Sequence, residues 1–119
     1  MNIESLREYC LSKKGVTEST PFGPDTLVFK VMGKMFALTN LDGDLSINLK
    51  CDPEKAIELR EEFPCVQPGY HMNKMHWNSV YIDGSVPEKL ICEWIDHSYN
   101  LIANSLPRKD KEILNSMFE

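Results

Sequence analysis

The chain has 119 residues, which is the size of one domain with one modest hydrophobic core. Hydrophobic residues make up 42% of it and charged residues 26%, so the composition excludes a disordered chain. The formal net charge of −5 argues against a generic nucleic-acid binder, which usually carries a basic excess, but it leaves room for a local basic patch. We therefore expect a single folded domain over residues 1–119.

The first segments predict a helix followed by a loop. Asn2 can cap the helix at its N-terminus, and Gly15 can end it. The apolar positions between them recur at helical spacing and form one face: Ile3, Leu6, Cys10 and Leu11. Residues 15–25 predict a loop, because their prolines and glycines disfavour regular structure.

Phe22 lies in the middle of this loop, between Pro21 and Gly23. One interpretation is that its ring fills the edge of the core, and we favour it because large apolar side chains are usually buried. The other interpretation places Phe22 at the tip of the loop as a recognition residue.

Residues 26–50 predict three antiparallel strands with one buried face. The segments TLVFKV, MFALT and LSINLK alternate apolar and polar side chains, and Asp42-Gly43 is a strong hairpin signal. The side chains expected to face the core are Leu27, Phe29, Val31, Phe36, Leu38, Leu45, Ile47 and Leu49. Those expected on the other face are Val28, Lys30, Ala37, Ser46, Asn48 and Lys50.

A second helix is predicted after these strands. Asp52 is its expected N-cap, with Pro53 at the first helical position. Pro64 ends it, because proline disfavours the helical conformation of the residue before it.

Two further strands are predicted, at residues 66–68 and 77–83, with an irregular segment at 69–75 between them. The longer strand has two possible registers, and its inward residues are then Asn78, Val80 and Ile82 or Trp77, Ser79 and Tyr81. We favour the first register because it buries the more aliphatic set, and it turns Trp77 and Tyr81 to the other face.

The C-terminal part predicts two helices. Ser85 and Glu88 match a capping box for a long helix that reaches about Ser105, and Pro107 begins a short peripheral helix within residues 107–119. The element order is therefore α-β-β-β-α-β-β-α, followed by this segment. It predicts an α+β fold, a two-layer sandwich in which an antiparallel five-stranded sheet carries helices on one face.

The sequence contains no catalytic signature. His71 and His76 are five residues apart, a spacing that shares a face on neither a helix nor a strand, and no third ligand lies near them. We therefore predict no metal site. Nucleophile and phosphate-binding motifs are also absent from the sequence, so we expect neither enzymatic activity nor a cofactor.

The four cysteines include no C-x-x-C pair, which argues against structural zinc. Cys10 and Cys92 fall on apolar helix faces, whereas Cys51 and Cys65 flank the second helix and could be accessible. The polar N-terminus does not resemble a signal peptide, so we expect a cytoplasmic protein with reduced thiols. No apolar run approaches the roughly 20 residues of a membrane span.

The remaining candidate site is the sheet face turned away from the core. Its lysines, aromatic rings and neighbouring residues are Lys30, Lys34, Lys50, Lys74, His76, Trp77 and Tyr81. Charges for phosphate and rings for stacking are what a nucleic-acid platform needs. A structural interpretation stands beside it, in which Trp77 and Tyr81 complete the core and the lysines keep the sheet soluble.

Several motifs occur together along the chain. They are Pro21-Phe22-Gly23, FKVMGKMFAL at 29–38, LKCDP at 49–53, PGYHMNKMHW at 68–77, Ser98-Tyr99 and Leu106-Pro107. Together they resemble the MmcQ/YjbR family of small bacterial proteins, from the first helix to about Pro107. The resemblance implies a CyaY-like or secretion-chaperone-like fold. It also implies DNA binding, with the β-hairpins as two wings, and brings no catalytic residues.

Three functional hypotheses follow. The first is a small cytoplasmic DNA-binding module that uses Lys30, Lys34, Lys50, Lys74, His76, Trp77, Tyr81 and Phe22. The second is a protein-interaction module, or a homodimer, that uses the same face together with Met35, Met72 and Met75. The third is a small-ligand binder or an enzyme, with Lys74, His71 and His76 near a pocket at Phe22.

Overall fold

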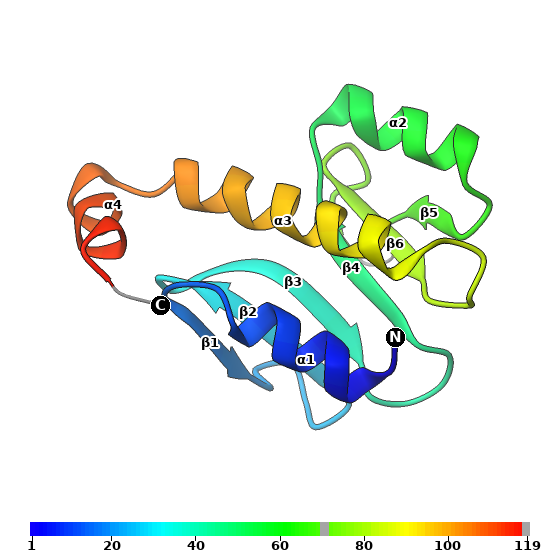
Figure 1. The fold of residues 1–119 in the computed structure, drawn as a ribbon, viewed down its shortest axis with the longest axis horizontal. Coiled ribbons are helices and arrows are strands. Elements are labelled where there is room, and N and C mark those ends of the chain that lie inside the picture. The colour runs from blue at the N-terminus through cyan, green and yellow to red at the C-terminus, as the bar shows by residue number, and fades with distance from the viewer. Residues whose placement is uncertain (70–71, 118–119) are drawn as a thin grey trace.

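The computed structural model describes residues 1–69 and 72–117, in which four helices accompany one antiparallel sheet (Figure 1). The helices are α1 (Ile3–Leu11), α2 (Pro53–Glu62), α3 (Glu88–Asn104) and α4 (Arg108–Asn115). The strands are β1 (Val16–Ser19), β2 (Thr26–Val31), β3 (Lys34–Asn40), β4 (Ser46–Lys50), β5 (Val66–Pro68) and β6 (Trp77–Tyr81). Their order across the sheet is β1-β2-β3-β4-β6-β5. The α+β fold is thus confirmed, whereas β6 ends two residues before the predicted Asp83.

The sheet has six strands, and the prediction of five was wrong. The additional strand is β1, which lies in the segment 15–25 that we expected to be a loop. β1 pairs with β2 along the edge of the sheet, with Thr17 opposite Lys30. Four residues pair because β2 offers a free edge there, and the prolines that suggested a loop begin only after Ser19.

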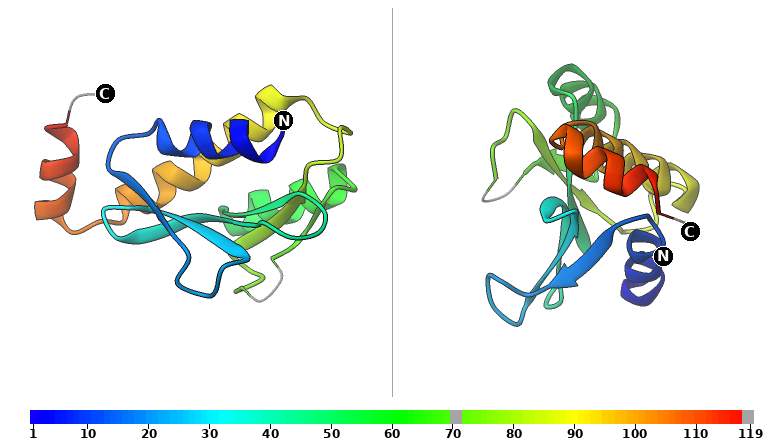
Figure 2. Two further views of the ribbon diagram at one scale, coloured as in Figure 1. Left: turned by 90° about the horizontal axis from the view of Figure 1, so that it is seen from below. Right: turned by 90° about the vertical axis from the view of Figure 1, so that its left-hand side faces the viewer.

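The helices α1, α2 and α3 lie on one face of the sheet (Figure 2). α3 packs on β3 and β4, α1 contacts β1, and α2 contacts β5 and β6. We call the opposite face the helix-free face. Two loops project on that side in both views of Figure 2, the one between β1 and β2 and the one that leads into β6.

The core lies between the sheet and the helices. α3 contributes a stripe of buried apolar side chains at helical spacing, namely Ile91, Trp94, Ile95 and Ile102. The predicted capping box at the start of α3 was wrong. Pro87 is the N-cap, and the backbone N–H of Ser85 instead donates a 2.9 Å hydrogen bond to Oδ1 of Asp83 in a turn.

The first two helix starts follow the sequence. Asn2 and Ser5 form a reciprocal capping box for α1, and the side chain of Asp52 accepts from Lys55 at the start of α2. α1 ends at Leu11, earlier than the predicted stop at Gly15.

A bulge in β3 changes which side chains face the core. Phe29 pairs with Ala37, but Lys30 pairs with Met35, so Phe36 is an extra residue in the ladder. Phe36 and Ala37 consequently both join the core. The expected places of Ala37 and Leu38 were therefore reversed, since Leu38 lies on the helix-free face opposite Val28.

The favoured register of β6 is confirmed. Val80 pairs with Ile47 and belongs to the core cluster, while Trp77 pairs with Lys50 on the helix-free face. Among the described residues, no helix is long and apolar enough to cross a membrane.

α1 and α3 are joined by a polar cluster above the core. The Tyr9 hydroxyl donates a 2.6 Å hydrogen bond to Asp96, and the Lys13 ammonium forms an ion pair with the same carboxylate at 2.5 Å. Lys13 also lies about 5 Å from the ring centroids of Tyr9 and Tyr99. Burial of Tyr9, followed by its hydrogen bond to Asp96, raises the pKa of its hydroxyl. These contacts link α1 and the residues that follow it to α3.

Candidate functional site

The helix-free face brings together lysines from separate strands. Lys30 stands opposite Thr17 and Met35, and Lys50 stands opposite Trp77 in the neighbouring pair of strands. The loop before β6 adds Lys74 on the same side, where it lines a hollow with residues of β5 and β6. Three lysines predicted from the sequence therefore share one face and one end of the sheet.

Lys34 does not join them. It pairs with Val31, whose side chain packs in the core, so strand alternation turns Lys34 toward the helix side. The sequence placed it with the others because it lies in the adjoining hairpin.

Most acidic residues of the sheet and its loops point away from these lysines or lie at the other end of the strands. Glu18 is the single acid within the six strands, and it pairs with Arg7 of α1 at 2.7 Å on the helix side. Four acids lie at the opposite end of the sheet from Lys30 and Lys50: Asp25, Asp42, Asp44 and Asp83. Asp52 follows Lys50 by two residues, but its side chain caps α2. The sheet is thus polarised along its strands although the whole chain carries a net charge of −5.

The start of the motif at 68–77 is fixed by a close backbone approach. Gly69 donates a 2.7 Å hydrogen bond from its N–H to the carbonyl oxygen of Trp77. A Cβ atom on Gly69 would lie 2.7 Å from the Cβ of Trp77 and 2.8 Å from its carbonyl oxygen. Glycine is therefore required here because any side chain would collide with β6.

The rest of the loop is organised by Asn73 and Arg60. The Asn73 side chain accepts from Met75 N–H at 2.9 Å, and its backbone carbonyl accepts from Trp77 N–H at 2.9 Å. Arg60 reaches across from α2, and its Nε donates a 2.6 Å hydrogen bond to Asn78. Its Nη2 also donates to the carbonyl oxygens of Lys74 and Trp77. The guanidinium thereby holds the loop that carries Lys74 against the body of the protein.

A hollow of about 290 Å³ opens beside Lys74 on the helix-free face. Its walls are Gln67, Pro68, Lys74, Ser79 and Tyr81. The Ser79 hydroxyl donates a hydrogen bond to the buried Oδ1 of Asn48, which fixes the floor between β4 and β6. The hollow combines a cation, an amide and an aromatic ring, so it offers groups that can bind a phosphate and a flat ring.

The aromatic residues of the predicted site differ in accessibility. Trp77 is only 8% exposed and offers little ring surface, whereas Tyr81 is 39% exposed at the rim of the hollow. Phe22 is 68% exposed, so the interpretation that it fills the core edge was wrong. It lies in the loop between β1 and β2, at the opposite edge of the sheet from Lys74, and does not line this hollow.

The motif at 68–77 contains two histidines, His71 and His76. His76 is half-buried at the entry to β6, and its carbonyl oxygen accepts a 2.7 Å hydrogen bond from Cys51 N–H. His71 lies outside the described residues. Among the residues that the structure describes, no three side chains of the metal-binding types gather in one place.

The thiols of Cys51 and Cys65 are buried, which corrects the expectation that they could be accessible. Burial raises the pKa of Cys51 to about 11, so the reactive thiolate is scarce at neutral pH. Cys51 and His97 line the same small cavity, where Nε2 of His97 accepts a hydrogen bond from Asp52 N–H at 3.3 Å. These contacts give both residues a structural role.

Arg60 and Gln67 are the parts of the site that the sequence analysis missed. The side chain of Gln67 donates a 2.9 Å hydrogen bond to the carbonyl oxygen of Pro64, which places it at the mouth of the hollow. Arg60 is the only arginine on a mostly acidic helix, and that was the one sequence signal that could have drawn attention to it.

Comparisons with known proteins agree with the motifs. The family model described as YjbR matches residues 11–101. The uncharacterised protein YbdF of Escherichia coli O157:H7 is 40% identical over 92% of this chain and 90% of its own length. The uncharacterised protein YjbR of Escherichia coli K12 is 35% identical, over 96% of this chain and 98% of its own. A crystal structure of the Deinococcus radiodurans protein DR2400 has a TM-score of 0.89 and 39% identity, and the match covers 96% of this chain and 88% of that one.

Proposed function

The chain belongs to the YjbR family, and we propose that its helix-free face binds single-stranded DNA. This proposal rests on the separation of charge on the sheet. Lys30, Lys50 and Lys74 lie on the same face, and the strands place no acidic side chain on it. Nucleic-acid binding depends on local positive charge near phosphates, and a negative total does not prevent it when the acids lie elsewhere.

The shape of the face favours a single strand over a duplex. Among the described residues no helix lies on this side, so the face lacks a recognition helix for a major groove (Figure 2). Tyr81 is exposed beside a hollow and is instead suited to unpaired bases, which stack on aromatic rings. Phe22 provides a second exposed ring, in the loop between β1 and β2 at the other edge of the sheet.

Fluorescence anisotropy with a labelled oligonucleotide, across a salt series, tests the proposal. Three lysine–phosphate contacts predict a slope of log K against log [salt] of about −2 for a single strand. The double variant Lys30→Gln/Lys50→Gln should weaken binding and reduce the slope by about 1.4, because each lost contact removes roughly 0.7. A duplex of the same sequence should bind more weakly than the single strand.

Lys109→Gln is the matched control, because it removes a charge from an exposed position on α4. Tyr81→Leu removes the ring and keeps an apolar side chain, and it should weaken binding by about 1–3 kcal/mol if a base stacks there. The proposal fails if no binding occurs at micromolar protein in low salt. It also fails if Lys109→Gln weakens binding as much as the double variant does.

A further inference from the structure

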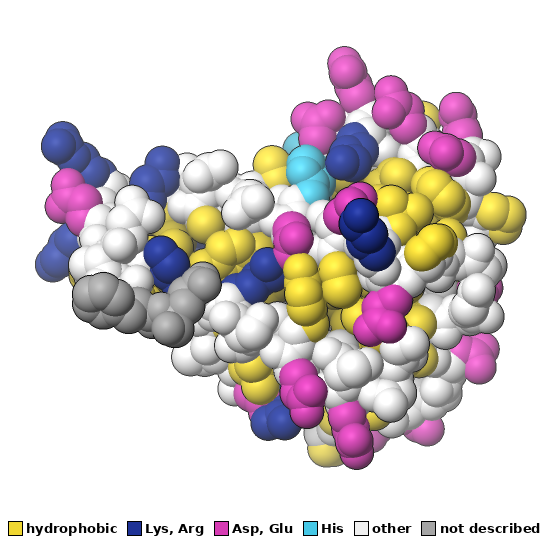
Figure 3. All heavy atoms as spheres, in the orientation of Figure 1, with side chains coloured by type: hydrophobic (Ala, Val, Ile, Leu, Met, Phe, Trp, Pro, Cys, Tyr) yellow, Lys and Arg dark blue, Asp and Glu magenta, His cyan; other side chains and the backbone are white. Residues whose placement is uncertain are grey.

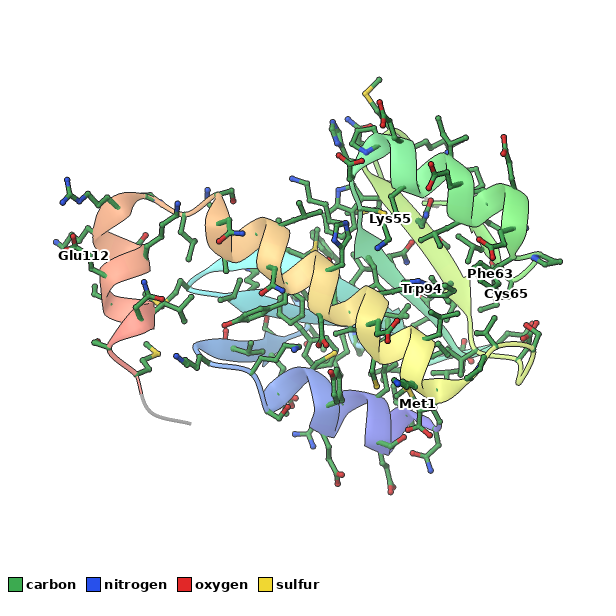
Figure 4. The ribbon with its side chains drawn as sticks, turned by 45° about the horizontal axis from the view of Figure 1, so that its top comes forward. Met1, Lys55, Phe63, Cys65, Trp94 and Glu112 are labelled. Atoms are coloured by element: carbon green, nitrogen blue, oxygen red, sulfur yellow. The ribbon has the colours of Figure 1, made fainter. Side chains whose placement is uncertain are left out.

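A second concave surface lies on the opposite side of the molecule, between α2 and α3. Side chains of both helices, together with Asp52 just before α2, line a groove of about 510 Å³ (the helices are labelled in Figure 1). Its floor is apolar and consists of Leu59, Phe63, Leu90 and Trp94. The rings of Phe63 and Trp94 meet edge to face with centroids 5.1 Å apart, and Figure 4 shows these side chains in the space between the helices. The packing of these rings closes the bottom of the groove.

The rim of this groove is strongly acidic. Its lining includes Asp52, Glu54, Glu58, Glu62 and Glu93, against the single base Lys55. Figure 3 shows hydrophobic side chains between the helices, with acidic side chains around them and basic side chains beside them. Among the described residues, Glu54, Glu58, Glu62 and Glu93 form no ion pair.

The acidic residues on one side of α2 repel one another and so destabilise the helix in the isolated chain. Glu54, Glu58 and Glu62 follow one another at four-residue spacing, so their carboxylates are neighbours on one side of the helix. Like charges at this spacing destabilise a helix by a few tenths of a kcal/mol per pair, roughly 0.2–0.5. A cationic partner in the groove would remove that repulsion.

We infer that this groove docks an amphipathic helix of a partner protein, with apolar residues on one face and lysine or arginine beside them. The groove lies between two helices whose backbone groups are satisfied internally, so it offers no strand edge to an extended peptide. A partner must therefore bind through side chains, and a third helix can pack into the groove between two neighbouring helices. Charge complementarity requires that the helix be basic.

The test uses a synthetic 16-residue helix with leucines at i, i+4 and i+7 and lysines flanking them. Titration by calorimetry at low salt should show binding, and Glu58→Gln/Glu62→Gln should weaken it by about two- to fivefold per carboxylate. Leu90→Ala should also weaken binding, because it removes part of the apolar floor. Circular dichroism of each variant verifies that it is folded.

Two controls make the result specific to the groove. Glu61→Gln removes a carboxylate from α2 that does not line the groove, and it should change affinity less than twofold. A peptide of identical composition, with its leucines redistributed around the helix, should bind at least about tenfold more weakly because it lacks an apolar face. The inference is overturned if the designed helix does not bind, if the redistributed peptide binds equally well, or if Glu61→Gln acts like the groove variants.

Discussion

Ser98 Oγ donates a 2.5 Å hydrogen bond to the carbonyl oxygen of Phe36, which lies 62 residues away in the sequence. The same hydroxyl oxygen accepts a 2.8 Å hydrogen bond from the backbone N–H of Lys50. The bulge at Phe36 shifts the register between β2 and β3, and the ladder between β3 and β4 ends at the neighbouring pair Ala37–Leu49. The fully buried Ser98 of α3 satisfies the two backbone groups beyond that pair. One serine thereby joins the helix layer to the lysine end of the sheet.

Replacement of Ser98 by alanine is expected to destabilise the fold. It leaves a buried carbonyl and a part-buried N–H without their partner, at a cost of about 2–4 kcal/mol in the free energy of unfolding. Urea unfolding followed by circular dichroism measures this cost. Ser116→Ala, at an exposed position after α4, should change the free energy of unfolding by less than about 0.5 kcal/mol. A loss at Ser98 no larger than this control would mean that the bridge contributes nothing.

The bulge also shows where sequence reasoning reached its limit. Alternation correctly assigned the faces of β2, β4 and β6, because those strands keep a period of two. It failed for Ala37 and Leu38 because the extra residue Phe36 is accommodated through contacts with α3, which is remote in sequence. The short strand β1 was missed for a related reason, since its only partner is the edge of β2.

Gly69→Ala is expected to disturb the junction between β5 and β6. The new Cβ would lie within 3 Å of both the Cβ and the carbonyl oxygen of Trp77, so the backbone must shift at a cost of about 1–3 kcal/mol. Gly43→Ala provides the comparison, because its φ of +81° strains an alanine although its surroundings are open. That variant should lose about 1–2 kcal/mol through conformation alone. A near-ultraviolet circular dichroism change in the Gly69 variant only would locate the disturbance at Trp77.

Arg60→Lys tests whether the guanidinium positions the loop of the proposed DNA site. Lysine keeps the charge but cannot make the forked contacts to Lys74, Trp77 and Asn78. We expect faster hydrogen exchange at the Trp77 amide, a loss of about 1–3 kcal/mol in the free energy of unfolding, and weaker binding of single-stranded DNA. Arg108→Lys, whose side chain is exposed on α4, should leave all three measurements unchanged.

The candidate site was predictable in its residue types and less so in its geometry. Lys30, Lys50 and Tyr81 follow from alternation along single strands, which is a local property. The contribution of Arg60 depends on α2 crossing β6, and the distance between Phe22 and Lys74 depends on the order of the strands. Both are long-range features that no local pattern encodes, so the hypothesis that Lys74 lies near a pocket at Phe22 was wrong.

His97 is expected to make stability depend on pH below neutrality. Burial, and then the nearby charge of Lys55, lowers the pKa of its imidazole from 6.5, although Asp52 opposes this shift. The unfolded chain therefore binds this proton more tightly than the folded chain, so the stabilisation is present above pH 6.5 and declines as the pH falls toward the folded pKa. The free energy of unfolding, measured in urea between pH 7.5 and 5, should decrease more steeply for the wild type than for His97→Gln. His76→Gln controls for the loss of an imidazole as such, and identical curves for the wild type and His97→Gln would contradict the prediction.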